Sequence, residues 1–383
     1  MSLHMQESDM MGKKICCIFN AAPHYRKSIY NLMSERLGCH FYFGKASVGT
    51  KGIKSIPDDE LPPHSVFFDN CAVINPPFYW QKGVLKLLFQ PYDIYLMTGE
   101  PYCLTTWLFL FLHLFSRKKI IFWTHGWYGD ESFAKIVLKK IFFGLADHIL
   151  TYGNYAKKLM VEHGFRPDKI SVIYNSLDYT SALKIRESLQ PGSIYTDHFG
   201  CQAPVICFSG RLSPVKKLDL LLQIIARFKA QGRRLHCILV GDGEYRQPLL
   251  ELAAELGIAD QVWFYGACYE EEKIAEIMFN ADLCVIPDNA GLSVLHAMSY
   301  GCPVITHDYF PAQGPEFEII KDGVNGSFYR FGDDEALKEK VQFWCFEQPL
   351  TREQIRENCC ASVAGEWNSD YQEQVLEEVV SRI

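Results

Sequence analysis

The sequence predicts an α/β protein made of two domains, each with a mostly parallel, doubly wound sheet. Its 383 residues exceed what one ordinary hydrophobic core accommodates. Short apolar runs alternate with segments of helical periodicity across short connections, which is typical of parallel sheets covered by helices. The alternation stops over 180–202 and then restarts, so we expect an N-terminal domain over 12–190 and a C-terminal domain over 200–366. Residues 367–383 are expected to pack back on the first domain, and a deep cleft is expected between the two domains.

The N-terminal half contains several apolar runs of strand length. They cover 13–19, 39–43, 92–97, 119–124, 147–152 and 169–174. Helices are expected between them, over 25–37, 103–115, 133–143 and 155–163. Residues 45–77 are rich in proline and are expected to form surface loops around one short strand. Ligands of such sheets bind at the carboxyl ends of strands, where 99–100, 125–126 and 175–176 lie.

The C-terminal half repeats the pattern and ends in helices. Strands are expected over 204–208, 235–240, 261–265, 283–286 and 302–306, and helices over 218–231, 247–256, 274–280, 292–300, 335–346, 352–365 and 371–380. Within this half, 282–308 is expected to form a strand, a tight loop, a short helix and a strand. The free N–H groups at the helix start and the helix dipole suit a phosphate group. An ordinary βαβ corner without a ligand is the alternative.

Charge and composition argue against several function classes. The formal net charge of −7 disfavours a nucleic-acid surface as the main role. No G-x-G-x-x-G pattern follows the first strand, which counts against an NAD or FAD enzyme. The 14 cysteines show no metal-ligand spacing, so we expect reduced thiols in a cytoplasmic protein and no metal site.

Segment 103–115 is the most apolar stretch of the chain. It is too short to span a bilayer, so we expect a helix buried on a sheet. A contact with the membrane surface is the alternative, with basic residues at 117–119 and 135–140 facing anionic lipid. Residues 1–11 lack an apolar core, so no secretory signal is expected there.

An ordered set of motifs in the second half resembles family 4 (group 1) glycosyltransferases. The set comprises SGRLSPVKK at 209–217, VGDGE at 240–244, FYG at 264–266, GLSVLHAMSYGCPVI at 291–305 and DGVNGSF at 322–328. The N-terminal half matches more loosely, through FWTHGWYG at 122–129 and VIYNSLD at 172–178. The resemblance implies the GT-B fold, which has two Rossmann-like domains. It also implies sugar transfer with retention of configuration and without a metal or other cofactor, from a nucleotide-sugar donor expected to be a UDP- or GDP-sugar. The donor would lie mainly on the C-terminal domain and the acceptor on the N-terminal one.

Arg211 and Lys216 are the candidate catalytic residues on the donor side. Breaking a sugar–phosphate bond leaves a diphosphate with extra negative charge, which fixed cations stabilise in the transition state. Arg211 offers a planar fork and Lys216 a point charge, and the family uses the matching residues in this way. The alternative is a solvated basic loop before a helix. Further donor-side candidates are Gly210, Gly241, Gly243, Gly266, Asp288, Gly291, Leu292, Ser293, His296 and Glu316.

Two of these candidates mark a departure from the family. Most members carry two glutamates eight residues apart, the first contacting the donor sugar and the second the ribose hydroxyls. Asp288 and His296 fall on those positions here. A histidine can still hydrogen-bond a diol, but without a fixed charge. Glu316 is a candidate source of the missing carboxylate.

The acceptor-side candidates follow strands of the N-terminal half. His125 and Gly126 end one strand, and in the family a histidine placed like this lies near the donor sugar. A purely structural histidine is the alternative. Glu100 is a candidate to bind the acceptor or to act as general base, and a helix cap is the alternative. Tyr25 and Arg26, after the first strand, are further acceptor-side candidates.

Taken together, these features predict a retaining glycosyltransferase that acts on a glycan or lipid-linked acceptor in bacterial-type surface polysaccharide or glycolipid synthesis. The expected partners are the nucleotide sugar, the acceptor and an anionic membrane surface, and no nucleic acid. The expected location is the cytoplasm, with a peripheral position on the inner face of the membrane as a further hypothesis. Two alternatives stay open, a GT-B nucleotide-sugar epimerase and a non-catalytic protein that binds nucleotides or sugars.

Overall fold

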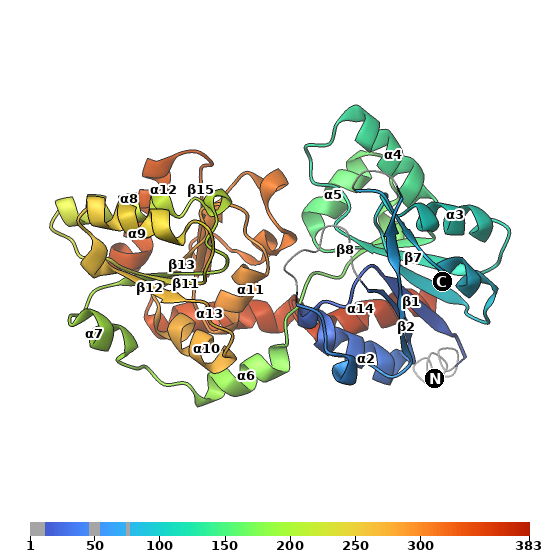
Figure 1. Ribbon diagram of the computed structural model, residues 1–383, viewed down its shortest axis with the longest axis horizontal. Helices are drawn as coiled ribbons and strands as arrows, with labels where there is room; N and C mark the ends of the chain where they lie inside the picture. Colours follow the sequence, from blue (N-terminus) through green and yellow to red (C-terminus); the bar gives the residue numbers. More distant parts are fainter. Residues whose placement is uncertain (1–11, 46–53, 74–76) are drawn as a thin grey trace. The chain divides into compact units, whose positions relative to one another are not determined.

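The computed structural model describes residues 12–45, 54–73 and 77–383 (Figure 1). The described chain forms two compact units. The first contains the residues up to Asp178 together with Asn368–Ile383, and the second contains Tyr179–Trp367. Each unit is built on its own parallel sheet, as the alternating pattern predicts. Residues 1–11, where no secretory signal was expected, lie outside the described residues.

The sheet of the first unit has seven parallel strands in the order β3-β2-β1-β6-β7-β8-β9. Their bounds are Ile15–Phe19 (β1), His40–Gly44 (β2), Ser65–Phe68 (β3), Ile94–Thr98 (β6), Lys119–Thr124 (β7), His148–Thr151 (β8) and Ile170–Val172 (β9). Every residue of β1 is buried, because helices cover both faces of the sheet. This arrangement explains why its sequence reads as a continuous apolar run.

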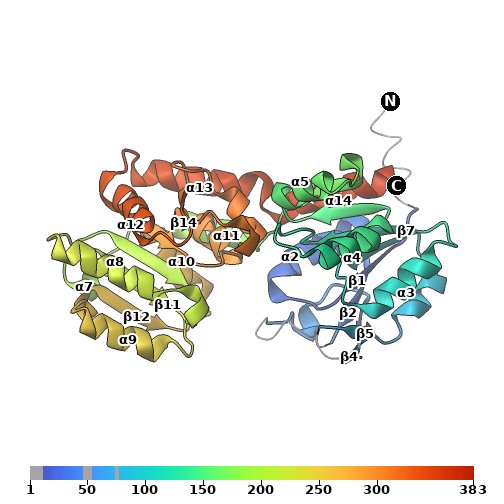
Figure 2. The same ribbon diagram turned by 90° about the horizontal axis from the view of Figure 1, so that it is seen from above.

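Helices from both ends of the chain cover this sheet (Figure 1). One face carries α2 (Lys27–Leu37) and α14 (Ser369–Arg382), and α14 is held there by an ion pair between Arg36 and Glu373 at 2.8 Å. The other face carries η3 (Val84–Phe89), α3 (Leu104–His113), α4 (Phe133–Gly144) and α5 (Asn154–Glu162). In Figure 2, α3 and α4 occupy the same side of the sheet. The C-terminal helix therefore returns to the first unit.

The proline-rich segment 45–77 is more regular than expected. Within its described part, β3 is the edge strand of the seven-stranded sheet, and β4 (Asn70–Ala72) pairs in antiparallel fashion with β5 (Tyr79–Gln81). The prediction of one short strand was therefore wrong. Prolines flank these strands, and strand edges tolerate proline because they need no hydrogen bond on one side. Residues 46–53 and 74–76 lie outside the described residues.

The sheet of the second unit has six parallel strands in the order β12-β11-β10-β13-β14-β15. They are Val205–Ser209 (β10), His236–Val240 (β11), Val262–Gly266 (β12), Leu283–Val285 (β13), Val304–His307 (β14) and Gly326–Tyr329 (β15). The main helices are Asp219–Ala230 (α8), Arg246–Glu255 (α9), Glu271–Asn280 (α10), Leu292–Ser299 (α11), Asp334–Gln342 (α12) and Arg352–Glu366 (α13). The strand β15 was missed by the sequence pattern.

The expected connection between the domains is part of the second unit instead. Residues 180–202 lack a clean apolar period, yet they form α6 (Tyr179–Ser188) and α7 (Ile194–Phe199). Tyr195 of α7 is buried and donates a hydrogen bond to the Ile277 carbonyl at 2.7 Å. The few residues that anchor these helices are too sparse to produce a periodic pattern. Among the described helices, none is long and apolar enough to cross a bilayer.

Candidate active site

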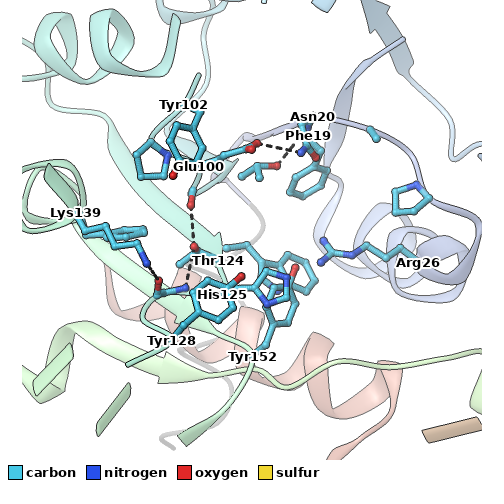
Figure 3. Close-up of a pocket in the computed structure, with 18 of the residues that line it drawn as sticks. Phe19, Asn20, Arg26, Glu100, Tyr102, Thr124, His125, Tyr128, Lys139 and Tyr152 are labelled. Atoms are coloured by element: carbon cyan, nitrogen blue, oxygen red, sulfur yellow. Dashed lines mark hydrogen bonds between the residues drawn. The ribbon is translucent and has the colours of Figure 1, made fainter. Parts of the chain in front are cut away.

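A cavity of about 430 Å³ opens at the carboxyl ends of β1, β6 and β7 in the first unit (Figure 3). Parallel strands place their following loops at one edge of the sheet, so residues distant in sequence meet there. The cavity is lined by all the acceptor-side candidates, which are Tyr25, Arg26, Glu100, His125 and Gly126. The structure therefore brings this predicted set together.

Glu100 is oriented by two side-chain donors. Its Oε2 atom accepts hydrogen bonds from Asn20 Nδ2 at 3.2 Å and from the Tyr79 hydroxyl at 2.8 Å. Burial, together with Cys103 and Glu100, raises the pKa of Tyr79, so this hydroxyl stays protonated and donates. The N-cap of α3 is Cys103, so Glu100 does not cap this helix. Its carboxylate is instead held at the cavity wall.

His125 lies between aromatic rings and opens into the cavity. Its ring centroid is 4.6 Å from that of Tyr152 and 5.9 Å from that of Tyr128. Burial of the ring, with the positive charges of Arg26 and Lys139, lowers the pKa of His125 to about 4. The ring is therefore neutral at neutral pH and can exchange hydrogen bonds with a ligand without adding charge.

The turn that carries His125 is fixed by backbone geometry. Thr124 Oγ1 donates to the Gly99 carbonyl at 2.8 Å and accepts from the Gly126 N–H at 3.1 Å. Gly126 has a φ of +68°, and a Cβ there would lie 3.1 Å from the Met160 sulfur. A side chain at Gly126 would thus be strained and crowded. Lys139 Nζ holds the same turn by donating to the Gly126 carbonyl at 2.8 Å.

On the second unit, two lysines contact the loop that precedes α11. Lys216 Nζ donates to the Asn289 carbonyl at 2.8 Å, and Lys217 Nζ lies 3.9 Å from Asp288 Oδ1. Burial lowers the pKa of Lys216, and Asp288 opposes that effect. Both cations therefore lie beside the start of α11, where the helix N–H groups were expected to bind phosphate. Gly291 is the N-cap of α11, and Leu292 and Ser293 follow it half-buried.

Arg211 is exposed and pairs with Glu244. Its Nη2 and Nε atoms lie 2.9 Å and 3.2 Å from Glu244 Oε2. A ligand phosphate would have to compete with this carboxylate for the guanidinium. The pair is solvent-exposed, so it is weak and exchangeable.

Glu316 brings a buried carboxylate to the start of α11. A Cβ added to Gly314 would lie 2.7 Å from Glu316 Oε2, and one added to Gly291 would lie 3.9 Å from it. Gly314 N also donates to the Ala290 carbonyl at 2.7 Å, which ties the two loops together. The Glu316 carboxylate therefore lies next to the start of α11.

His296 is paired with a carboxylate that the sequence reasoning missed. His296 Nε2 lies 2.7 Å from Glu271 Oε1, and the Tyr300 hydroxyl donates to the same atom at 2.6 Å. Burial is the largest single effect on Glu271 and opposes its charge, but the hydrogen bond and charge attraction of His296 together with the hydrogen bond from Tyr300 lower the pKa of Glu271. Only the tertiary structure could reveal this pair, since Glu271 is 25 residues away in the chain.

Gly241 and Gly243 make close backbone contacts. A Cβ on Gly241 would lie 1.8 Å from the Gly210 carbonyl oxygen, and one on Gly243 would lie 2.1 Å from the Leu212 carbonyl oxygen. Their φ angles are +147° and +158°. These glycines are therefore required where two strand-end loops pack against each other. Gly266, with a φ of +93°, accepts from Gly241 N at 2.8 Å and extends this contact.

Models of known protein families match both halves of the chain. The family described as "Glycosyl transferases group 1" matches residues 200–359, and "Glycosyltransferase Family 4" matches residues 53–181. The chain belongs to the group 1, family 4 glycosyltransferases. The first match includes Arg211 and the second includes Glu100, whereas Tyr25 and Arg26 precede the second match.

Curated relatives match parts of the glycosyltransferase. The D-inositol 3-phosphate glycosyltransferase of Nocardia farcinica is 29% identical over 192 residues, which are 46% of this chain and 39% of that protein. The putative glycosyltransferase EpsD of Bacillus subtilis is 28% identical over 138 residues, which are 36% of this chain and 35% of that protein. The chain thus spans less than half the length of these relatives.

Solved structures resemble the glycosyltransferase over nearly its whole length. Alr3699/HepE of Anabaena in complex with UDP has a TM-score of 0.70 at 18% identity, over 97% of this chain and 100% of that chain. The lipopolysaccharide outer core galactosyltransferase WaaB in its apo form has a TM-score of 0.68 at 18% identity, with the same coverage. These likenesses show that the two α/β units have the GT-B fold. The cleft expected between them stays a prediction.

Sequence reasoning missed several residues that shape the sites of this glycosyltransferase. Asn20 directly follows β1, so its place at a strand end was an available signal. Lys139 was noticed as part of a basic cluster, but its bond to Glu131 at 2.5 Å places it in the cavity wall. Tyr79 and Glu271 gave no such signal, because each acts through a contact made only in the folded chain.

Proposed function

We propose that this glycosyltransferase moves a sugar, with retention of configuration, from a nucleotide-diphosphate sugar to a hydroxyl group of a glycan or lipid-linked acceptor. The observation that carries the proposal is the position of Lys216, whose amine lies 2.8 Å from the Asn289 carbonyl just before α11. A fixed cation and the free N–H groups of a helix start together form a site for a diphosphate. Lys216 comes from the first strand-end loop of the second unit, so distant parts of the sequence contribute to one site.

The chemistry assigned to this site is charge stabilisation of the leaving group. As the bond between the sugar and the phosphate oxygen breaks, the nucleoside diphosphate gains negative charge, which Lys216 and Arg211 would stabilise. Arg211 would exchange Glu244 for the diphosphate, because its exposed ion pair is weak. The proposal gives this role to protein cations and requires no metal ion or other cofactor. Glu316 and Asp288 would bind sugar hydroxyls, and His296 with Glu271 the ribose.

The acceptor would bind in the cavity of the first unit. Glu100 is held by Asn20 and Tyr79 with its carboxylate at the cavity wall, where it would accept a hydrogen bond from the acceptor hydroxyl or remove its proton. The neutral ring of His125 would hydrogen-bond a sugar hydroxyl. HepE was solved with UDP and with UDP-glucose, which supports a UDP-sugar donor, with GDP-sugars as the other candidate class.

We further propose a peripheral position on an anionic membrane, through a surface formed by α3 and α4. The exposed apolar residues Phe111 (57%), Phe115 (80%), Phe133 (81%) and Ile141 (55%) lie on it, and neither helix contains Asp or Glu. Trp107 of α3 packs on Phe142 of α4 with ring centroids 5.1 Å apart, so the two helices are adjacent (Figure 2). We call this set, with the basic residues described next, the α3–α4 surface.

Charge supports lipid as the occupant of the α3–α4 surface. Arg117, Lys135 and Lys140 are exposed, and none has an ion-pair partner within the described ranges. By contrast, Lys119 pairs with Asp147 at 3.2 Å, so only part of the predicted basic cluster is free. Exposed apolar side chains together with unpaired cations on the same helices and their flanks suit the headgroup boundary of anionic lipid. A membrane position fits a lipid-linked acceptor and a role in surface polysaccharide or glycolipid synthesis.

The proposal is tested with nucleotides and donor sugars. Thermal shifts with UDP, GDP, ADP, CMP and their common sugars should single out one base, since a ligand at a hundred times its Kd stabilises by about 2.7 kcal/mol. Transfer or slow donor hydrolysis, followed by NMR of the product anomer, should then show retention. Absence of nucleotide binding, or binding without any donor turnover, would favour the non-catalytic alternative. An epimerised donor without transfer would favour the epimerase.

A further inference from the structure

Arg26 is a cation in the cavity wall that is surrounded by aromatic rings. Its Cζ atom lies 4.7 Å from the ring centroid of Trp123, 5.2 Å from that of Tyr152 and 5.9 Å from that of Tyr25. Stacking on ring faces holds a guanidinium in place. The hydroxyls of Tyr25 and Tyr30 also interact with the Arg26 guanidinium and favour its charged form, although neither is a carboxylate. Figure 3 shows the Arg26 side chain reaching into the cavity from the start of α2.

Arg26 has no acidic partner among the residues that the structure describes. None of the ion pairs recorded there involves it, and its Nε atom is buried without a hydrogen-bond partner among them. The other cation deep in the cavity, Lys139, is paired with Glu131. A desolvated charge without a counter-charge is unfavourable, so an unmatched arginine facing a cavity is poised for an anionic ligand.

The rest of the cavity does not neutralise Arg26. His125, whose ring lies between Tyr152 and Tyr128, adds no charge at neutral pH. The Glu100 carboxylate is engaged with Asn20 and Tyr79, which belong to other elements. The cavity therefore has a region that accepts hydrogen bonds, at Glu100, and a region with a cation that has no counter-charge, at Arg26 (Figure 3). Lys135 also lines the cavity without an ion pair among the described residues, but it is solvent-exposed, whereas Arg26 lies among aromatic rings.

We propose that the acceptor of this enzyme carries an anionic group, a phosphate or a carboxylate, that pairs with Arg26 while its reacting hydroxyl lies at Glu100. This inference rests on the proposed transferase function and names its acceptor class. The planar guanidinium matches the geometry of both anions with two parallel hydrogen bonds. A cavity of about 430 Å³ is within the usual size of small-molecule sites, so it accommodates one charged sugar unit.

The test compares three sugars of one skeleton, glucose, glucose 6-phosphate and glucuronate, as probes of the full-length protein. Calorimetry should give at least about tenfold tighter binding for one or both charged sugars, as expected from a charge-assisted hydrogen bond. The charged sugar that binds more tightly distinguishes phosphate from carboxylate. To remove phosphate binding on the second unit, the titrations are repeated in Arg211→Ala/Lys216→Ala. Equal binding of all three sugars in that background overturns the inference.

Two variants at Arg26 test whether its positive charge causes the preference for charged sugars. Arg26→Gln should abolish the preference for charged sugars, and Arg26→Lys should retain part of it. A preference that survives Arg26→Gln overturns the inference. If either variant fails to fold, the wild-type protein decides, because pairing with Arg26 predicts a preference that falls with rising salt while glucose binding stays constant.

The outcome also separates this inference from the proposed function. Donor turnover with a neutral acceptor, unaffected by Arg26→Gln, would leave the transferase standing and remove the anionic acceptor. Charged-sugar binding that depends on Arg26, in a protein that binds no nucleotide, would support the anionic site at Arg26 and remove the proposed transferase function.

Discussion

Lys216 donates a hydrogen bond to the Asn289 carbonyl at 2.8 Å, although the two residues are 73 positions apart. The contact joins the loop after β10 to the loop before α11, and so places a cation at a helix start. Lys217 reaches Asp288 in the same loop. The sequence suggests each loop separately as a ligand site, and this contact shows that the two loops lie side by side.

Removing the donor-side cations should lower the rate of transfer. We expect Lys216→Ala and Arg211→Ala each to reduce kcat/KM by at least about 100-fold, because each loses a charge contact with the leaving diphosphate. Initial rates of transfer or donor hydrolysis measure this effect. Arg227→Ala, which breaks an exposed pair with Glu335 on the same unit, is the matched control and should stay within about twofold of wild type. Near-wild-type rates in both site variants would remove the diphosphate assignment.

Glu271 should influence nucleotide binding through His296. Glu271→Gln weakens the hold on His296, so we expect roughly tenfold weaker binding of the preferred nucleotide and less discrimination against its 2′-deoxy analogue. Calorimetric titrations with the two nucleotides measure both effects. Glu272→Gln, at the next position of α10, is the control. If Glu271→Gln leaves the discrimination intact, the ribose does not bind at this pair.

His125 should make the fold less stable as the pH falls. Its pKa in the folded protein is about 4, below the ordinary value of 6.5, so the unfolded chain binds more protons between these values. The free energy of unfolding therefore decreases as the pH falls from about 6.5 towards 4, and the stability is fully present above 6.5. Urea denaturation at several pH values should show a smaller decrease for His125→Asn than for wild type.

His148 and His236 contribute with the same sign, because burial also lowers each of their pKa values to about 4. The difference between wild type and the His125 variant is therefore the informative quantity. An identical pH dependence in both proteins would contradict the buried, neutral state of His125.

The α3–α4 surface should bind anionic vesicles in a salt-dependent manner. Charge reversal in Lys135→Glu/Lys140→Glu should weaken binding to phosphatidylserine vesicles by at least tenfold, because each lysine near such a surface contributes about 1 kcal/mol. Phe133→Ser should also weaken vesicle binding, because the apolar ring no longer inserts into the lipid. Vesicle sedimentation at low and high salt measures both. Tyr269→Ser is the matched apolar control, since Tyr269 is 90% exposed on the second unit. Absence of binding even at low salt would remove the membrane proposal.

Gly241 should tolerate no side chain. Gly241→Ala places a methyl group 1.8 Å from the Gly210 carbonyl oxygen at a φ of +147°, so we expect at least about 2 kcal/mol of destabilisation. Gly365→Ala is the control, because Gly365 lies in α13 with no atom within 4 Å of an added Cβ, and should be neutral or slightly stabilising. Denaturant unfolding of both variants measures the difference. Similar stabilities would contradict the close approach of the two loops.

The sequence by itself determined the GT-B architecture, the alternation of strands and helices, and the loops in which the candidate residues lie. Strand and helix patterns are local, since burial on a sheet or on one helix face imposes a period of two or 3.6 residues. Motif order in 209–328 was sufficient for the family. The sequence pattern did not predict the helices α6 and α7 or the strand β15. Isolated buried anchors such as Tyr195 produce no periodic pattern of apolar residues.

Only the tertiary structure decided how the side chains pair. Glu271 with His296, Glu244 with Arg211, Tyr79 with Glu100, and Arg26 with its aromatic rings are contacts between elements far apart in sequence. Their geometry depends on strand order and loop conformation, which no local pattern encodes. For the same reason, the unmatched charge of Arg26 became visible only when its surroundings were complete, because a charge is unpaired only in relation to the groups that the fold places around it.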